Sequence, residues 1–329
     1  VALGGFGAEN ITTGSNNVAV GYQALRTETG SSENVAIGYQ ALKTQNGGVG
    51  NVGIGNNAGL SNTTADYNVL IGAASGDALT TGGRNVVVGK GALGTANTAT
   101  LNVAIGVAAM EDVPVDVLLT GCVAIGKDAF KGAAGTTADA DGTVAIGYQA
   151  GLALTVGQYN TAIGYQALDA EDDGDKNTAI GYQALTAQTG TSGSVGNTAV
   201  GYRAGVSITT GTSNTAIGNQ ALYTEDAGIG HTAIGDSAAY FCNADGYNTA
   251  VGGTAMYYNV SGKYNVYLGY QAGLGASGQS NSYNTGIGAQ SMDTITTGGY
   301  NTCVGQGSGG ALTSSSYNTF IGAWCGDGA

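Results

Sequence analysis

The sequence predicts an all-β fold, a parallel β-solenoid of 19 coils in which each coil stacks on the next. The first observation is a recurring motif, Asn-(Val/Thr)-Ala-(Ile/Val)-Gly, whose glycine occurs 19 times. The second is the spacing, because 14 of the 18 intervals between these glycines are 17 residues and the others are 19 to 21. A fixed period below about 50 residues indicates stacked repeats, and the helical repeat families need about 33 residues or more.

The residues around each glycine predict a short strand. The residue directly before the glycine is Ile, Val or Leu, the residue three before it is Val or Thr, and the residue between them is most often Ala. This alternation is typical of a strand, and a 17-residue coil has room for two strands of about five residues and two tight turns. We expect the branched side chains to lie against a packed apolar partner, so that Ile163→Asp would bury a charge and collapse the local stack, whereas Asp172→Ala would be nearly silent.

Two columns of the repeat are predicted to form structural ladders along the stack. The residue four before the glycine is Asn in 15 of 18 copies, with Cys122, Thr143 and His231 in the others. In parallel coils about 4.8 Å apart, each Asn side chain can bond to its neighbours or cap a turn. The glycines indicate positive φ or a close backbone approach. The clearest ladder residues are Asn160, Asn177, Asn197, Asn214, Gly164, Gly181, Gly201 and Gly218.

The period makes residues 1–329 one continuous solenoid, although this length could hold two ordinary domains. The chain begins and ends in mid-repeat, and we therefore expect it to be a segment of a longer repeat protein. Extra residues lengthen four spacers, and these insertions are expected to bulge from one edge without breaking the strand ladder. They lie near residues 107–122, 127–143, 186–197 and 274–284.

Composition argues against several classes of partner. Only 9% of the residues are charged, and the net charge is −13 with nine Lys and Arg. Nucleic acids and anionic membrane surfaces attract basic tracks, so neither is an expected partner. No run of 18 apolar residues occurs, and we expect no membrane insertion in this segment.

Tyrosines form two columns in successive coils. Tyr148, Tyr165, Tyr182 and Tyr202 directly follow the motif glycine. Tyr247, Tyr264, Tyr283, Tyr300 and Tyr317 directly precede the Asn. Aromatic side chains one coil apart can stack, each pair adding about 0.5 to 1.5 kcal/mol beyond area burial. We expect packing within the fold or between subunits, and the second column is also a candidate ligand strip for a sugar or a receptor.

No residue pattern indicates catalysis, a cofactor or a metal. His231, the only histidine, occupies the Asn column, and its expected role is the hydrogen bonding that Asn performs elsewhere. Four cysteines occupy four different columns without the CxxC spacing of zinc sites, which favours small buried residues. The sequence leaves open whether Cys303 and Cys325 form a disulfide bond. The acidic runs at 171–175 and 139–142 indicate solvated turns, with Ca²⁺ binding as the alternative.

The motif resembles the head repeats of trimeric autotransporter adhesins, the YadA-like heads, and the related repeats of phage tail-fibre-like proteins. It reads NVAIG at 34–38 and NTAIG at 160–164, 177–181 and 214–218, with a small residue three positions after the glycine, and the likeness covers nearly the whole chain. The resemblance implies a left-handed parallel β-roll, three chains side by side about a threefold axis, and attachment to a host or surface. The 17-residue period is longer than those adhesin heads typically use, and residues 1–329 contain no neck motif, stalk, membrane barrel or fibre chaperone domain.

The sequence therefore predicts a non-enzymatic structural fibre, a shaft or head segment exposed outside the cell on a virion or a bacterium. Its expected partner is itself, as a homotrimer that could extend end to end, and an adhesive role would involve a cell-surface glycan or receptor. Two alternatives come from other classes. The Thr residues at the first motif strand position from Thr161 to Thr249 suggest an ice-binding solenoid, and paired carboxylates could serve a glycan-depolymerising tailspike segment.

Overall fold

The computed structural model describes residues 1–113, 119–132, 140–189, 193–243 and 246–327. The chain divides into two compact units, Val1–Ile163 and Gly164–Ala329. Every regular element of the described residues is a β-strand, and 19 of the strands are copies of the repeat motif. The predicted all-β parallel solenoid with a 17-residue repeat is thereby confirmed.

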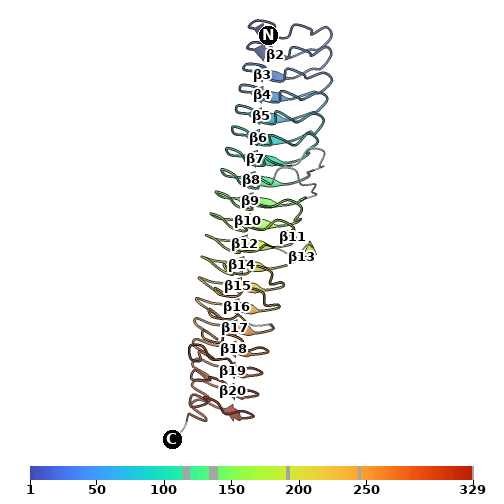
Figure 1. The fold of residues 1–329 in the computed structure, drawn as a ribbon. Coiled ribbons are helices and arrows are strands. Elements are labelled where there is room, and N and C mark those ends of the chain that lie inside the picture. Colours follow the sequence, from blue (N-terminus) through green and yellow to red (C-terminus); the bar gives the residue numbers. More distant parts are fainter. Residues whose placement is uncertain (114–118, 133–139, 190–192, 244–245, 328–329) are drawn as a thin grey trace. The chain divides into compact units, whose positions relative to one another are not determined.

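The first unit is a stack of ten strands, each paired in parallel with the next (Figure 1). The motif residues are in register, so that Val18, Ala19 and Val20 lie opposite Val35, Ala36 and Ile37. The strands are β1 (Ala2–Leu3), β2 (Val18–Val20), β3 (Val35–Ile37), β4 (Val52–Ile54), β5 (Val69–Ile71), β6 (Val86–Val88), β7 (Val103–Ile105), β8 (Val123–Ile125), β9 (Val144–Ile146) and β10 (Thr161–Ile163).

The second unit continues the same pattern with nine motif strands, and it adds a short parallel pair within an inserted spacer. The motif strands are β12 (Thr178–Ile180), β14 (Thr198–Val200), β15 (Thr215–Ile217), β16 (Thr232–Ile234), β17 (Thr249–Val251), β18 (Val266–Leu268), β19 (Thr285–Ile287), β20 (Thr302–Val304) and β21 (Thr319–Ile321). The additional pair is β11 (Gly174–Asp175) with β13 (Gly193–Ser194).

The insertions leave the strand ladders intact. Strand β8 pairs in register with β7 and with β9 across two lengthened spacers. In the second unit, β12 pairs with β14 and β18 with β19 across lengthened spacers in the same register. The expectation that the insertions do not break the ladder is confirmed. Within them, residues 114–118, 133–139 and 190–192 lie outside the described residues.

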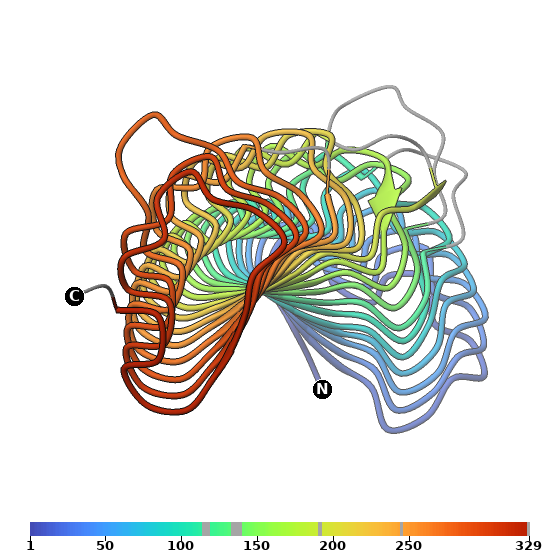
Figure 2. The ribbon, with the colours of Figure 1, turned by 90° about the horizontal axis from the view of Figure 1, so that it is seen from below.

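The motif strands have three residues, or two in β1, and apart from β11 and β13 the described part of each coil contains no second strand, in place of the two longer strands that we predicted. After the glycine the backbone is left-handed at alternate residues, as at Gln23 (φ 56°) and Leu25 (φ 47°). Such residues curl the chain and prevent an extended second strand. The turns instead bond to the neighbouring coils, since Gln40 N donates to Tyr22 O at 2.8 Å and Leu42 N to Ala58 O at 2.9 Å. Figure 2 shows successive coils of each unit following similar paths, each rotated slightly from its neighbour.

The interior of each coil is lined by small strand residues and by leucines of the turn. Ala19, Ala24 and Leu25 are completely buried, whereas Val18 and Val20 on either side of Ala19 are only half-buried. The branched residues therefore do not fill the interior of the coil. Ile163, at which we predicted a buried charge, is likewise only half-buried. The small residue faces inward because a turn leucine lies against it. At Gly53, for example, an added Cβ would lie only 2.7 Å from the Leu42 side chain.

Larger residues at the middle strand position are matched by glycines in the turns. A Cβ on Gly76 would lie 2.9 Å from Leu70, and a Cβ on Gly273 would lie 2.5 Å from the Tyr267 ring. Tyr267 is completely buried, and its hydroxyl donates to Asn281 Oδ1 at 2.6 Å. A large strand residue thus occurs with a small turn residue, so that the core of the coil is filled without overpacking.

Candidate functional site

The predicted Asn ladder is present in the structure. Asn197 N donates to Asn177 Oδ1 at 3.0 Å, and Asn214 N donates to Asn197 Oδ1 at 2.8 Å. The amide nitrogens of Asn197 and Asn214 donate to the carbonyls of Gly211 and Gly228 at 2.6 and 2.7 Å. Each Asn thus joins two coils and holds a turn. Asn160 is completely buried in the first unit, in the same column.

The predicted role of the glycine column is also confirmed. Gly164, Gly181, Gly201 and Gly218 have φ between 135° and 139°, a region that side chains of L-residues rarely adopt. A Cβ at any of the four would lie 2.3 Å from the carbonyl oxygen of the next glycine in the stack. No side chain fits, so glycine is required by both conformation and space.

One outward surface of each unit is a sheet face without charged side chains at its strand positions. It consists of the first and last residues of the motif strands, and we call it the outer sheet face. The first residue is Val or Thr in every motif strand but β1, and the last residue is Ile, Val or Leu. Val86 is 38% exposed, and Ile234 and Ile287 are 37% and 39% exposed. No charged residue occurs at these two positions in any motif strand, although the chain carries 22 Asp and Glu and nine Lys and Arg.

The candidate ligand strip forms a continuous stack of rings. The centroid distances along Tyr247, Tyr264, Tyr283, Tyr300 and Tyr317 are 5.6, 5.2, 4.6 and 5.0 Å, with interplanar angles of 20° or less. Each of the three inner rings has a neighbour on both faces, so only edges and hydroxyls reach solvent. Because sugars stack on ring faces, this arrangement favours a structural ladder over a glycan strip.

The other tyrosine column is stacked where its members lie in one unit. Tyr182 stacks with Tyr165 at 5.2 Å and with Tyr202 at 5.3 Å. Tyr148 belongs to the first unit, where Lys127 Nζ lies 5.3 Å from its ring centre. These rings are 38–47% exposed and flank the outer sheet face.

A third aromatic cluster was missed by the sequence analysis. Tyr240 stacks between Tyr223 at 4.7 Å and Tyr257 at 5.1 Å, and Phe241 stacks on Tyr258 at 5.7 Å. The three tyrosines are each the fifth residue after a motif glycine. Aligning that column would have revealed them, because they occur in three successive coils.

A buried polar column was also missed. The seventh residue after the glycine turns inward, and in several coils it is an acid or an amide that caps the following turn. In the first unit, Glu28 Oε1 accepts a hydrogen bond from Gly30 N at 2.8 Å. The completely or almost completely buried polar members of this cap column are Glu28, Gln45, Asn62, Glu171, Gln188, Glu225 and Asn259.

The acidic run at 171–175 supplies one of these caps. Glu171 Oε1 accepts hydrogen bonds from Asp172 N at 3.1 Å and Gly174 N at 2.8 Å. Burial raises the pKa of the Glu171 carboxyl above its ordinary 4.5. Asp172 and Asp173 have carboxylates close to that of Glu171, but the two hydrogen bonds to Glu171 Oε1 hold the turn. Of the second run, Asp139 lies outside the described residues, and Asp141 Oδ1 accepts a hydrogen bond from Thr120 N at 2.7 Å.

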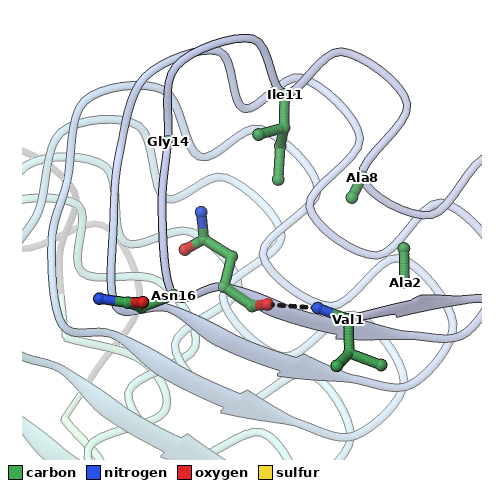
Figure 3. A pocket seen from close by; sticks show the side chains of 7 residues that line it. Val1, Ala2, Ala8, Ile11, Gly14 and Asn16 are labelled. Carbon is green, nitrogen blue, oxygen red and sulfur yellow. Dashed lines mark hydrogen bonds between the residues drawn. The ribbon is translucent and has the colours of Figure 1, made fainter.

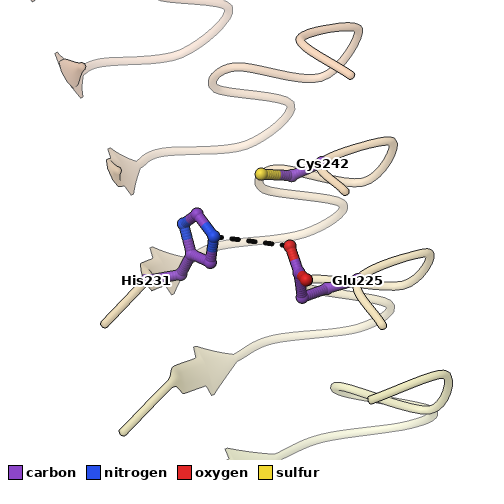
Figure 4. Close-up of side chains that lie close together, drawn as sticks. All are labelled: Glu225, His231 and Cys242. Atoms are coloured by element: carbon purple, nitrogen blue, oxygen red, sulfur yellow. Dashed lines mark ion pairs between the residues drawn. The ribbon is translucent and has the colours of Figure 1, made fainter. Parts of the chain in front are cut away.

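One cluster brings together three different metal-ligating side chains. Ligand atoms of Glu225, His231 and Cys242 all lie within 4.8 Å of one another, and all three residues are 0–1% exposed. Figure 4 shows His231 next to β16, facing Glu225 and Cys242 on two successive turns. His231 Nε2 lies 3.4 Å from Glu225 Oε2.

His231 also performs the role expected of the Asn column. Its backbone N donates to Asn214 Oδ1 at 2.9 Å, and its Nδ1 accepts a hydrogen bond from Asn248 N at 3.3 Å. The prediction that the histidine replaces Asn in the ladder is confirmed. The linear spacing of the cysteines could not reveal the cluster, because Glu225 and Cys242 occupy the cap column in successive coils and His231 occupies the Asn column.

All four cysteines are free thiols, so Cys303 and Cys325 do not form the disulfide bond that the sequence left open. Cys122, Cys242 and Cys303 are buried, as expected for small residues filling tight positions. Burial raises the pKa of the Cys122 thiol to about 11, which keeps that thiol protonated and unreactive at neutral pH.

The first coil borders a hollow with a volume of about 240 Å³ (Figure 3). The α-amino group of Val1 donates to Asn17 O at 2.8 Å beside this hollow. The lining side chains are apolar or amides and offer no catalytic acid or base. The lining residues are Val1, Ala2, Ala8, Ile11, Gly14, Asn16 and Asn17.

Comparison with known proteins gives no family assignment. No protein-family model matches the chain, and no curated protein sequence matches it. Within the described residues, no helix has the length and apolar character needed to cross a membrane.

Proposed function

We propose that the chain is a non-enzymatic structural fibre protein, a shaft or head segment exposed on a virion or a bacterial surface. In this proposal its principal partner is a second and a third copy of itself, packed side by side as a homotrimer. The observation that carries the proposal is the outer sheet face, which runs along each unit without a charged residue at its two strand positions.

The charge distribution supports self-association over this face. The net charge of −13 makes copies of the chain repel one another wherever acids face acids. Charged side chains occur instead in the spacers, as in the run 171–175. The outer sheet face is a long surface on which two copies can approach without burying a charge, and covering its partly exposed Ile and Val side chains is favourable.

A fibre also accounts for the way in which the chain uses its polar groups. The buried Asn residues bond coil to coil, and the buried acids cap turns, as Glu171 does. The adhesive role is a further part of the proposal, with a cell-surface glycan or receptor as partner. The covered faces of the tyrosine stack make the inserted spacers better candidates for that contact than the rings themselves.

The test is the solution mass of the chain by light scattering. We expect three times the chain mass of 32.2 kDa. A double variant, Ile217→Lys with Ile234→Lys, places two charges on the outer sheet face at side chains that are 36% and 37% exposed. This variant should fold, as judged by an unchanged circular dichroism spectrum, and have the mass of one chain.

Asn219→Lys is the matched control, because it adds a lysine directly after a motif glycine, where the chain itself carries Lys90 and Lys127. It should keep the mass of the unmodified chain. If the unmodified chain has the mass of a single copy at all concentrations, the homotrimer is wrong.

The second candidate is ice binding, favoured by the outward threonines of β12 and β14 to β17, which lie in register. The coils of this unit turn steadily about the stack (Figure 2), so the threonines follow a twisted surface and match a flat ice plane poorly. Thermal hysteresis at high protein concentration would favour this candidate over the fibre.

A further inference from the structure

We propose that Glu225, His231 and Cys242 form a buried binding site for one divalent transition-metal ion, of which Zn²⁺ is the best match. This site is independent of the fibre proposal, because it lies inside a single coil stack and away from the outer sheet face. It also departs from the sequence expectation of no metal, which rested on linear spacing.

The ligand set fits zinc in chemistry. A carboxylate oxygen, an imidazole nitrogen and a thiolate sulfur are the three kinds of ligand that zinc takes from proteins, and Mg²⁺ or Ca²⁺ would not favour the nitrogen and sulfur. Three protein ligands leave one position of a tetrahedral ion for water or for another polar group. Asn248 borders the cluster, with Nδ2 at 3.9 Å from Cys242 Sγ.

The distances fit after a small adjustment. Zinc bonds of about 2.0 to 2.3 Å place the ligand atoms of a tetrahedral site about 3.3 to 3.8 Å apart. His231 Nε2 and Glu225 Oε2 are already 3.4 Å apart, and all the ligand atoms lie within 4.8 Å. A small rotation of the Cys242 side chain would bring its sulfur to the distance from the other two ligand atoms that zinc requires.

The charges balance when the ion is bound. Zinc binding releases the thiol proton of Cys242, and the resulting thiolate and the Glu225 carboxylate carry two negative charges. All three residues are 0–1% exposed. A divalent cation neutralises this buried pair, whereas either anion alone is costly to bury.

The metal also changes the protonation of the histidine. In the metal-free chain Nδ1 accepts the hydrogen bond from Asn248 N, so the ring proton lies on Nε2 and faces Glu225. Zinc takes the Nε2 lone pair and the ring proton moves to Nδ1. The backbone amide of Asn248 then loses its acceptor, and the hydrogen bond that is lost is a long one of 3.3 Å. The amide resonance of Asn248 should therefore shift on metal binding.

The repeat itself supplies substitutions that keep the fold. The chain carries Asn at the position of His231 in 15 coils. Glu225 and Cys242 both occupy the cap column. In other coils this column carries Gln, as at Gln45 and Gln188, or Ala, as at Ala96. His231→Asn, Glu225→Gln and Cys242→Ala therefore install residues that this fold already accommodates, and each removes one ligand.

The experiment titrates the full chain with Zn²⁺ under reducing conditions, with the bound metal measured by elemental analysis after gel filtration. We expect one zinc per chain, and Co²⁺ in its place should give the charge-transfer absorption of a cobalt–thiolate bond. His231→Asn and Cys242→Ala should each weaken zinc binding at least tenfold. Glu225→Gln should weaken it less if water replaces the carboxylate, and its cobalt complex should keep the thiolate band.

Cys303→Ala is the matched control, because it removes a buried thiol at a position where the repeat usually has Ala, and it should bind as the unmodified chain does. Circular dichroism spectra and melting temperatures of the metal-free variants check that each is folded. The proposal is overturned if the unmodified chain binds no zinc, or if folded His231→Asn and Cys242→Ala bind zinc as tightly as it does.

Discussion

At the scale of single residues, the repeat acts as its own set of controls, because the same backbone position occurs many times with different side chains. The glycine column has the least freedom. Its φ values lie outside the range of other residues, and the carbonyl of the next coil occupies the place of a side chain. By contrast, Gly253 directly follows a motif glycine and has room for a Cβ, with the Tyr270 ring at 3.5 Å.

Gly201→Ala is therefore expected to be strongly destabilising, by at least about 2 kcal/mol, because it combines a strained φ with a steric clash. A Cβ there would lie 2.3 Å from Gly218 O. Gly253→Ala should change stability by less than about 0.5 kcal/mol. Urea unfolding of both variants checks the difference, and equal midpoints would contradict the assigned role of the glycine column.

The buried acid Glu171 predicts a dependence of stability on pH. Burial raises its folded-state pKa above the ordinary 4.5, so the unfolded chain loses this proton first as the pH rises. Its favourable contribution is fully present below pH 4.5 and is lost as the pH rises toward the folded-state pKa. Glu171→Gln installs a neutral residue that the same column uses at Gln45 and Gln188.

The free energy of unfolding of Glu171→Gln should therefore rise relative to that of the unmodified chain as the pH increases above 4.5, and the difference should then level off. Urea unfolding from pH 4 to pH 8 measures it, with Asp172→Ala as the exposed control. Two curves that stay parallel over this range would show that Glu171 keeps an ordinary pKa in the folded chain.

At the scale of the element, one coil consists of a three-residue strand and a turn whose side chains fill the same space from opposite sides. This is why the middle strand residue is usually Ala beside a turn leucine, and why Leu70 occurs with Gly76. Leu93, Leu42 and Leu25 occupy the position of Gly76 in other coils, with φ of 46–49°. A leucine is therefore compatible with the backbone at Gly76, where φ is 54°.

Leu70→Ala should cost about 3 kcal/mol by leaving a cavity, and Gly76→Leu alone should cost about 1 to 3 kcal/mol by overpacking. The double variant recreates the common arrangement of small strand residue and turn leucine, so its loss should be smaller than that of Leu70→Ala. Urea unfolding of the four proteins gives the coupling energy. If the loss of unfolding free energy in the double variant equals the sum of the two single losses, the side chains at positions 70 and 76 do not fill the same space.

At the scale of the whole molecule, each unit is a one-dimensional stack in which every coil is stabilised mainly by its neighbours. The ladders of Asn, glycine and strand residues continue within each unit across spacers of different lengths. The insertions are thus accommodated in the spacers, and the outer sheet face keeps its register. This continuity is what makes the face suited to long contacts between copies, and the solution mass is the measurement that decides the proposed trimer.

The sequence by itself determined the fold class and the ladder columns. The 17-residue period identifies a solenoid, and residues that recur at one position, such as Asn197, Asn214 and the glycines, must lie above one another in a parallel stack. His231 could be assigned to the ladder for the same reason, since its column defines its surroundings.

Only the tertiary structure decided which way the side chains face and which columns meet inside a coil. The alternation at Val18, Ala19 and Val20 does not tell which side is inward, because that depends on the left-handed turn that places Leu25 against the alanine. The meeting of Glu225 and Cys242 with His231 has the same cause. Glu225 and Cys242 share the cap column in successive coils and His231 lies in the Asn column, and only the path of the turns brings the two columns together.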